Sequence, residues 1–482
     1  MSAAREVLAV DLDGTLIASD MLHESFWAAL GKDRALVMSA LGAFLSGGRA
    51  ALKARLATGV EIDVAHLPYK ETVLEELRAA KARGAHVVLA TASDRRMADA
   101  IAAHLDLFDE VLASDGETNL KGAAKADLLI EKFGEGGFAY MGDSTADLTV
   151  WEKSGEAISV DAPASLRTRI KASSVRHLEE ASGEQRQMQA AFRALRPHQW
   201  LKNLLVFIPM MLAHDFTGTA FAAALLAFAS FSLVASSVYV LNDLVDLSAD
   251  RAHPRKRMRP FASGALSLSV GLWLAPSLLL AGVILGAVVG SLFLWILLFY
   301  YLCTLAYSLG LKRITIIDIC MLAGLYTLRV VAGAAATMNV PSVWLLGFSI
   351  FFFLALAAVK RQAELVDLVA RGDEKAEGRG YLPDDLPLIT MMALASGYVS
   401  VLVAGLYLTS DAVAMLYSFP SALWGICAVL VYWVSRIVML THRRRMHDDP
   451  IVFAVTDKVS LFCGAMIVGL VILAARLSPL FP

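Results

Sequence analysis

Hydrophobic residues are distributed differently in the two parts of this chain of 482 residues. In the first part, up to about residue 190, short apolar runs such as 6–10, 85–90 and 138–141 alternate with longer mixed stretches. Short apolar runs separated by helical stretches are typical of a buried parallel sheet. In the second part, long hydrophobic stretches are joined by short loops. We therefore expect a multi-domain protein, with an α/β domain followed by an all-α polytopic membrane bundle.

The second part predicts about nine membrane-spanning helices, because most of its hydrophobic stretches approach the roughly 20 residues that cross a bilayer. The expected spans are 201–214, 218–241, 268–289, 291–310, 314–336, 342–360, 388–409, 413–436 and 458–477. The composition agrees with a membrane protein, since 57% of the residues are hydrophobic and the mean hydropathy is +0.59.

The distribution of Lys and Arg predicts the orientation of these helices. If the N-terminus is cytoplasmic, the loops on the cytoplasmic side are rich in Lys and Arg, whereas the opposite loops 213–219, 337–342 and 409–415 hold none. Basic loops remain in the cytoplasm, so we expect a multi-pass protein of the inner (cytoplasmic) membrane with a cytoplasmic N-terminal domain. The first residues do not resemble a signal peptide, because their apolar run ends at Asp11.

The net charge and the cysteines narrow the function further. A net charge of −2 argues against general nucleic-acid binding. Cys303, Cys320, Cys427 and Cys463 all lie in hydrophobic runs without the spacing of zinc ligands. We expect them to pack as small apolar side chains rather than to form disulfides.

An acidic segment follows the apolar run 231–241. Asp243, Asp246 and Asp250 are spaced so that their carboxylates would share one face of a helix. Such carboxylates repel one another unless a cation lies between them, and Mg²⁺ shared with substrate phosphates meets that need. Acids at a membrane edge are functional candidates, and Asn242 could ligate the metal or orient one of the acids.

Basic side chains on the same predicted side of the membrane would bind the phosphates of a substrate. These candidates are Lys202, Arg255, Lys256, Arg259, Lys312, Lys360 and Arg361. Arg329 lies within the fifth predicted span, where an unpaired charge is costly, so we expect it to be functional as well.

The segment 242–250 resembles the NDxxDxxxD motif of the UbiA-type membrane prenyltransferase superfamily. The nine-span layout and the tyrosine–lysine motif, Tyr307 with Lys312, fit the same family. The resemblance implies a Mg²⁺–diphosphate site at the cytoplasmic mouth of a helical bundle, where a polyprenyl diphosphate usually prenylates an aromatic acceptor. The chain departs from the aromatic-acceptor members, because their second acidic motif is reduced here to Asp318.

Several motifs are more similar to the polyprenyl-phosphate phosphoribosyltransferase branch of that superfamily. The matching segments are 196–203, 253–260, 360–364, 379–381 and 448–450. In that branch, phosphoribosyl pyrophosphate donates a 5-phosphoribosyl group to a polyprenyl (decaprenyl) phosphate. The resemblance covers roughly residues 190–482. It implies that Asp243 and Asp246, with Asp250, hold Mg²⁺ on the diphosphate while the lipid phosphate attacks the ribose.

Polar clusters follow the short apolar runs of the N-terminal part. They are DxDGT at 11–15, Thr91, Lys125 and GDxxxD at 142–147. Ligands of parallel sheets bind at the carboxyl ends of the strands, so these clusters should converge. Their order resembles that of the haloacid dehalogenase-like phosphatases over roughly residues 5–165.

The phosphatase resemblance implies a role for each cluster. Asp11 would be the nucleophile that forms an aspartyl-phosphate, and Asp13 would be the general acid and base. Thr91 and Lys125 would bind the phosphoryl oxygens, with Lys121 as the alternative lysine. The ligands expected for a second Mg²⁺ are Asp11, Asp13, Asp143 and Asp147.

These patterns give a domain plan and a combined function. We expect a Rossmann-like phosphatase domain over 1–165 with a small helical cap over about 17–83, a linker over 166–192, and the membrane transferase over 193–482. The membrane half would make a polyprenyl phosphoryl-ribose 5-phosphate, and the soluble half would remove its 5-phosphate.

Two alternatives remain open. One is a prenyltransferase that uses a polyprenyl diphosphate and an aromatic or other small acceptor, with an independent phosphatase domain. The other is a membrane scaffold or transporter with a degenerate enzyme core, against which the intact metal motifs of both halves argue.

Overall fold

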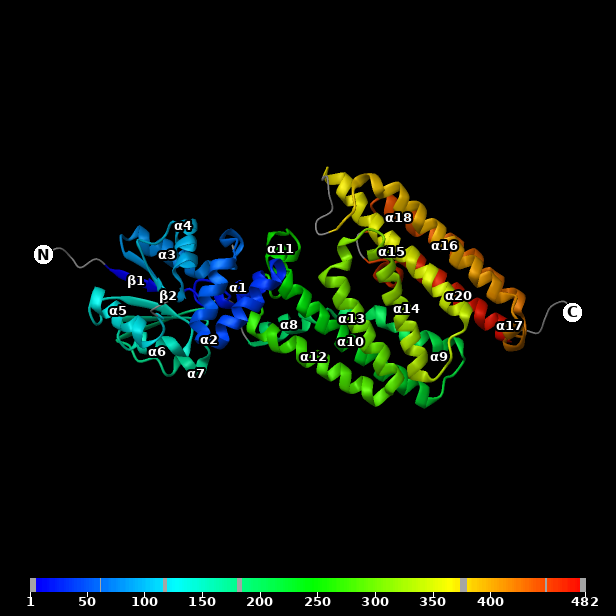
Figure 1. The fold of residues 1–482 in the computed structure, drawn as a ribbon, viewed down its shortest axis with the longest axis horizontal. Helices are drawn as coiled ribbons and strands as arrows, with labels where there is room; N and C mark the ends of the chain where they lie inside the picture. The colour runs from blue at the N-terminus through cyan, green and yellow to red at the C-terminus, as the bar shows by residue number, and fades with distance from the viewer. Residues whose placement is uncertain are drawn as a thin grey trace. The chain divides into compact units, whose positions relative to one another are not determined.

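The computed structural model describes residues 6–60, 62–115, 119–179, 184–372, 379–446 and 449–476. Asp448, in one of the predicted segments, lies outside these ranges. The chain folds as two compact units (Figure 1). The first unit contains residues up to 195 together with 239–276, and the second contains 196–238 and the residues from 277 onward. The acidic segment therefore belongs to the same compact unit as the N-terminal domain.

A six-stranded sheet forms the centre of the N-terminal domain. Its strands are β1 Val7–Val10, β2 His86–Asp94, β3 Glu110–Ser114, β4 Ala139–Gly142, β5 Glu156–Val160 and β6 Ser174–Leu178. The order is β3-β2-β1-β4-β5-β6 and all neighbours are parallel, which confirms the predicted α/β class. Chain order reverses across β1, and α/β proteins bind ligands at the carboxyl ends of strands beside such a switch point.

Helices cover both faces of this sheet (Figure 1). Helices α3 Glu71–Ala82 and α4 Arg95–Leu105 pack on one face, and α5 Ala123–Phe133 and α6 Leu148–Trp151 pack on the other. Successive side chains of β1 alternate between the two hydrophobic cores, as the pleat of a strand requires.

Two helices lie between β1 and α3. They are α1 Met21–Lys32 and α2 Arg34–Gly59, and the short 3-10 helix η1 Val64–His66 follows them. The Asp20 side chain accepts hydrogen bonds from the first free amides of α1, which is the usual capping role of Asp. This helical insertion agrees with the one expected from the sequence.

The expected linker 166–192 includes regular structure. Strand β6 extends the sheet past residue 165, and α8 Glu184–Ala194 follows it. The exact domain boundaries stay a prediction.

The described residues contain eight helices that are long and apolar enough to cross a membrane. They are α10 Gly218–Val245, α12 Leu268–Val289, α13 Ser291–Leu309, α14 Ile317–Thr337, α15 Val343–Arg371, α16 Leu386–Leu408, α18 Trp424–His442 and α20 Lys458–Arg476. The protein is thus a multi-pass membrane protein, and eight of the predicted spans correspond to helices.

The prediction of a first span over 201–214 is wrong. This stretch forms the 3-10 helix η3 Pro197–Phe207 and the short helix α9 Ile208–Leu212. Pro209 lies in the first turn of α9, where its missing N–H costs no helical hydrogen bond and favours a helix start after η3.

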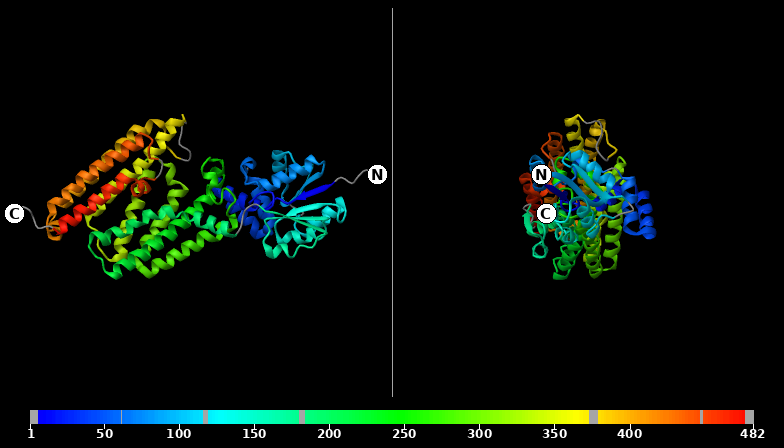
Figure 2. Two further views of the ribbon diagram at one scale, coloured as in Figure 1. Left: turned by 180° about the vertical axis from the view of Figure 1, so that it is seen from behind. Right: turned by 90° about the vertical axis from the view of Figure 1, so that its left-hand side faces the viewer.

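Helix α14 is the most deeply embedded helix of the second unit, and more than half of its residues are buried. At Gly333 the backbone of η3 lies directly against it, because an added Cβ would be 2.0 Å from the carbonyl oxygen of Val206. Helices α16, α18 and α20 pack side by side in the same unit (Figure 2).

Replacing Gly333 with Ala is expected to destabilise the membrane unit by about 1–3 kcal/mol, since the new methyl group forces η3 away from α14. Thermal unfolding of the detergent-solubilised protein, followed by circular dichroism, measures this loss. Gly347→Ala is the matched control, because its Cβ would meet Val403 at an ordinary 3.5 Å. Equal unfolding temperatures for the two variants would contradict the close packing at Gly333.

Candidate active sites

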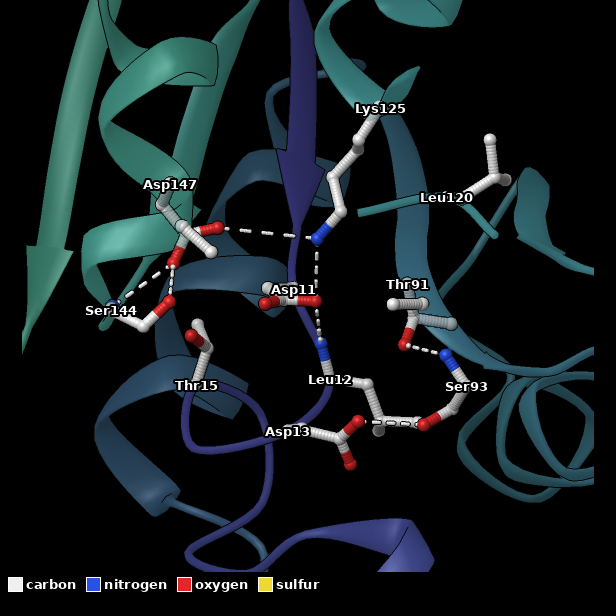
Figure 3. Close-up of polar contacts among 12 residues, drawn as sticks. Asp11, Leu12, Asp13, Thr15, Thr91, Ser93, Leu120, Lys125, Ser144 and Asp147 are labelled. Carbon is white, nitrogen blue, oxygen red and sulfur yellow. Dashed lines mark hydrogen bonds and ion pairs between the residues drawn. The ribbon is translucent and has the colours of Figure 1, made fainter. Parts of the chain in front are cut away.

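Three largely buried carboxylates converge at the carboxyl ends of β1 and β4. Figure 3 shows two of them, Asp11 and Asp147, together with Lys125. Asp11 follows β1, whereas Asp143 and Asp147 follow β4, and their ligand oxygens lie within 4.8 Å of one another. Among the described residues, no other group of three or more potential metal ligands comes this close. Burial, followed by repulsion from Asp11, raises the pKa of Asp143 to about 7. A hard divalent cation such as Mg²⁺ fits this set of oxygen donors.

Lys125 and Tyr140 hold these acids in place. Lys125 Nζ lies 2.8 Å from both Asp11 Oδ1 and Tyr140 Oη. The Tyr140 hydroxyl in turn donates to Asp147 Oδ1 at 2.8 Å. Lys125 is buried at the start of α5, whereas the alternative Lys121 is exposed. The geometry therefore favours Lys125 as the phosphate-binding lysine.

Tyr140 contacts the candidate site, and the sequence motifs did not reveal it. It lies in the middle of β4, and in an apolar run its hydroxyl gives no signal of its own. The only clue is that it precedes the GDxxxD motif by two positions. A residue two positions before a strand end projects to the same face as the strand's last residue, which places it beneath the site.

Asp13 has different partners from the three converging acids. Its carboxylate accepts hydrogen bonds from the Met21 amide at 2.8 Å and the Ser93 hydroxyl at 2.6 Å. Burial, followed by the charge of Asp20, raises its pKa to about 7. A carboxyl group that exchanges its proton near neutral pH suits a general acid and base. Nearby, Thr91 Oγ1 accepts from the Ser93 amide at 3.0 Å.

The acidic segment lies where α10 ends. The helix is interrupted at Asp246, and α11 Leu247–Ala252 begins after it, so the three acids do not share one continuous helix. Asp243 and Asp250 converge all the same. Arg259 Nη1 lies 3.2 Å from Asp243 Oδ1 and 2.5 Å from Asp250 Oδ2.

In this arrangement Arg259 supplies the cation that the buried acids need. Burial raises the pKa of Asp250, and the Arg259 charge opposes that rise. Asn242 and Asp246 are half-buried next to them. The carboxylates are suitable Mg²⁺ ligands, and their role as metal ligands stays a prediction.

Three of the predicted phosphate-binding cations lie at or near the surface. Arg255 and Lys256 are exposed, and Lys312, in the 3-10 helix η5 Leu311–Arg313, is half-buried. Their roles also stay predictions.

In the second unit, two of the predicted lysines converge on one buried acid. Lys202 Nζ lies 2.7 Å and Lys360 Nζ 3.2 Å from Asp449 Oδ2, and the Tyr326 hydroxyl approaches the same atom at 3.4 Å. Burial, followed by the charge of Lys360, lowers the pKa of Lys202 to about 8. Although burial raises the pKa of Asp449, the two lysines hold it well below its usual range. Among the residues that the structure describes here, two ammonium groups share one carboxylate, which leaves a net positive charge.

Arg329 is held by neutral groups. Its Nε donates to Asn203 Oδ1 at 2.9 Å, its Nη2 donates to Tyr300 Oη at 2.8 Å, and its Nη1 donates to the carbonyl of Leu325 at 2.6 Å. The guanidinium carbon also lies 4.9 Å from the centre of the Tyr300 ring. Within the described parts of the chain, no carboxylate lies at ion-pair distance from Arg329, so its charge is not neutralised.

Arg361 belongs to a different kind of cluster. It pairs with Asp318 at 2.6 Å and with Glu364, and Arg379 contacts the same two acids at 3.3 Å and 3.1 Å. The Tyr307 hydroxyl accepts from both arginines at 3.4 Å. Two arginines balance two acids here. The phosphate-binding roles of Arg361 and Tyr307 therefore stay predictions, and Asp318 is already paired.

The sequence of the membrane part decides the family. Residues 204–474 match the model of the UbiA prenyltransferase family. This chain belongs to that family. Residues 8–152 match the haloacid dehalogenase-like hydrolases, so a UbiA domain and a haloacid dehalogenase-like domain are joined in one enzyme. Both predicted resemblances are confirmed.

Three relatives show how far the similarity of this UbiA-family chain extends. It is 37% identical to the uncharacterized protein y4nM of Sinorhizobium fredii over 97% of this chain and 90% of that protein. It is also 37% identical to the nodulation protein NoeC of Azorhizobium caulinodans, over 56% of this chain and 88% of that protein. It shares 37% identity with the decaprenyl-phosphate phosphoribosyltransferase of Mycolicibacterium smegmatis over 36% of this chain and 56% of that enzyme.

Tyr140→Phe is expected to lower phosphatase activity roughly 10- to 100-fold and to raise the Mg²⁺ requirement, because partners of metal ligands contribute about that much. Hydrolysis of a small phosphate ester by the full chain, titrated with Mg²⁺, measures both effects. Tyr69→Phe is the control, since its hydroxyl bonds only the Val64 carbonyl. Indistinguishable titrations for the two variants would rule out the proposed support by Tyr140.

Proposed function

We propose that this enzyme transfers 5-phosphoribosyl from phosphoribosyl pyrophosphate to a polyprenyl phosphate and then removes the 5-phosphate. The UbiA domain performs the transfer, and the haloacid dehalogenase-like domain performs the hydrolysis. The product is a polyprenyl phosphoryl-ribose.

The observation that carries the proposal is the similarity of the UbiA domain to decaprenyl-phosphate phosphoribosyltransferases. The excess of cationic side chains around Asp449 and at Arg329 supports the proposal as well. Lys202 and Lys360 exceed the charge of Asp449, and Arg329 is held by neutral partners. A donor with a diphosphate and a 5-phosphate, together with a lipid phosphate acceptor, calls for more cationic groups than a simple prenyl diphosphate does.

In the transfer step, an oxygen of the lipid phosphate attacks the anomeric carbon of the ribose. The bond from that carbon to the diphosphate oxygen breaks, and its electron pair leaves with pyrophosphate. Asp243 and Asp246, with Asp250, would hold Mg²⁺, which stabilises charge on the leaving group. Lys202, Lys360 and Arg329 bind phosphate oxygens, and Asn242 orients an acid of the motif.

In the hydrolysis step, Asp11 attacks the phosphorus of the 5-phosphate and forms an aspartyl-phosphate. Asp13 gives its proton to the ribose oxygen as the phosphorus–oxygen bond breaks. Asp13 then takes a proton from the water that attacks the aspartyl-phosphate, and phosphate is released. Lys125 and Thr91 hold the phosphoryl oxygens, and Mg²⁺ bound by the neighbouring acids would neutralise their charge.

Both reactions are proposed to occur at the cytoplasmic side of the inner membrane. The support is the concentration of Lys and Arg in alternate loops of the predicted topology. Phosphoribosyl pyrophosphate, a water-soluble donor, would reach the enzyme from that side.

Asp11→Asn is expected to make a doubly phosphorylated ribosyl lipid accumulate, because transfer continues while hydrolysis loses its nucleophile. The assay uses membranes containing the full chain, radiolabelled phosphoribosyl pyrophosphate and polyprenyl phosphate, with lipid products separated by chromatography. Asp243→Ala is expected to abolish both lipid products.

Each outcome of this assay has a distinct meaning. If Asp11→Asn gives the same lipid as the parent chain, the phosphatase domain does not act on the transferase product. If the parent makes no ribosyl lipid but couples a polyprenyl diphosphate to a small acceptor, the chain is a prenyltransferase instead.

The transfer reaction is also expected to depend on the protonation of Lys202. Its pKa of about 8 means that the ammonium form, which binds phosphate, is lost as the pH rises through that value. The kcat/KM for phosphoribosyl pyrophosphate should therefore fall above pH 8, since this ratio reports ionisations of the free enzyme.

Arginine stays protonated at every pH of this experiment. Lys202→Arg should therefore move the fall in kcat/KM to higher pH, whereas the exposed control Lys153→Arg should leave it unchanged. A fall at the same pH in Lys202→Arg would assign the ionisation to another group.

A further inference from the structure

A buried ion pair joins the acidic segment to the haloacid dehalogenase-like domain. Arg251, next to Asp250 in α11, donates through Nη1 and Nη2 to the two carboxylate oxygens of Glu24 in α1, each at 2.7 Å. The side chains are only 6% and 4% exposed. A bidentate pair withdrawn from water fixes both distance and orientation.

Two close backbone contacts accompany this ion pair. An added Cβ at Gly31, near the end of α1, would lie 2.8 Å from the carbonyl oxygen of Val245. At Gly264, where φ is +75°, it would lie 2.7 Å from the Cβ of Ala18. Neither position has room for a side chain, so the acidic segment and the start of the phosphatase insertion cannot slide past each other.

On the phosphatase side, hydrogen bonds connect the ion pair to Asp13, the proposed general acid and base. Glu24 lies in the first turn of α1 and accepts a hydrogen bond from the Ser19 hydroxyl. The Ser19 carbonyl accepts from the amide of Gly14 in the DxDGT loop at 3.0 Å. Met21, the first residue of α1, donates its amide to Asp13. The orientation of this turn therefore sets one of the two hydrogen bonds that Asp13 accepts.

On the transferase side, Arg251 holds the loop that carries Arg259. Its Nε donates to the carbonyl of Ala262 at 3.0 Å. The same loop places Arg259 between Asp243 and Asp250. Arg251 thus fixes both α11, which contains Asp250, and the cation that neutralises the acids.

We propose that Arg251 and Glu24 are positioning residues that couple the two active sites of this enzyme. A change in the occupancy of the acidic motif alters the orientation of α11, and the ion pair passes that change to the first turn of α1 and to Asp13. Coupling between two binding sites is reciprocal. The effect on ribosyl transfer rests on the proposed function. The effect on hydrolysis requires only that the haloacid dehalogenase-like domain is an active phosphatase.

The phosphatase arm of the test measures hydrolysis of p-nitrophenyl phosphate by the full chain. Arg251→Lys, which keeps the charge but loses the bidentate geometry, should lower kcat roughly tenfold by misplacing Asp13, the proposed general acid and base, and leave KM unchanged. Arg176→Lys is the matched control, because Arg176 makes a bidentate pair with Glu76 elsewhere in the domain. A purely local role of Arg251 in the acidic segment would leave the phosphatase kcat at the value of the control.

The transferase arm measures the Mg²⁺ concentration that gives half-maximal ribosyl transfer. Glu24→Gln should raise it roughly tenfold, although Glu24 lies in the phosphatase insertion. Glu76→Gln is the control. The double variant, Glu24→Gln with Arg251→Lys, should raise this Mg²⁺ concentration no more than the single variant with the larger effect. Both substitutions break the same ion pair, so their effects should not add.

The coupling would be overturned if the effects of the two substitutions multiplied fully in the double variant. It would also be overturned if the Arg251 and Glu24 variants behaved like their controls in both arms. If Arg251→Lys lowers the unfolding temperature of the protein, the isosteric change Glu24→Gln tests the same ion pair in the phosphatase arm, with the same expected loss of kcat. If the parent chain makes no ribosyl lipid, the proposed function fails, and the phosphatase arm still decides the coupling.

Discussion

A carboxylate removed from water needs a cation beside it, because burial of an unpaired charge costs several kcal/mol. This constraint organises most clusters of candidate site residues in the described parts of the protein, whereas Asp13 is held by neutral donors. Lys125 meets it for Asp11, and Arg259 meets it for Asp243 and Asp250. Each cation comes from a different element than its acid, so neutralisation also fixes how those elements pack. A metal ion bound by either group of acids would enter a site whose side chains are already held in place by ion pairs.

The clusters differ in the ratio of cationic to acidic side chains. A cluster with excess cations can bind an anion directly, whereas a balanced cluster would first have to break an ion pair. Arg361 and Arg379 are matched by Asp318 and Glu364, and this closed network ties α14 to α15 and to the segment after it. Lys202 and Lys360, in contrast, share the single charge of Asp449. Excess positive charge in surroundings of low dielectric constant attracts phosphate strongly. A predicted cation is therefore best judged by the acids around it.

Local patterns in the sequence were sufficient to predict the parallel sheet and most of the membrane helices. The DxDGT segment converged with Lys125 and the GDxxxD segment because the carboxyl ends of parallel strands share an edge. Hydropathy failed at 201–214, where composition predicts a span although the backbone forms a 3-10 helix and a short α-helix. The break in the helix at Asp246 was equally invisible, since periodic spacing of acids does not reveal where a helix ends.

The contacts that could not be predicted join residues on different elements of the fold. Tyr140 supports a lysine and an acid on other elements, and Arg251 pairs with a glutamate more than two hundred positions earlier. No periodicity encodes such pairs, because each partner alone resembles an ordinary buried tyrosine or a solvated charge.

The range of the family match and the range of the compact unit differ in this protein. Residues 204–474 match the UbiA family, yet 239–276 pack with the N-terminal domain. Arg251 forms its buried ion pair with Glu24, so a UbiA domain without the N-terminal residues would lack this partner next to its acidic motif. Since an unpaired buried charge is not tolerated, that arginine would turn to solvent or to Asp250, and the acids would lose their present arrangement. The N-terminal domain in this sense helps to hold the acidic segment of the UbiA domain in its present arrangement.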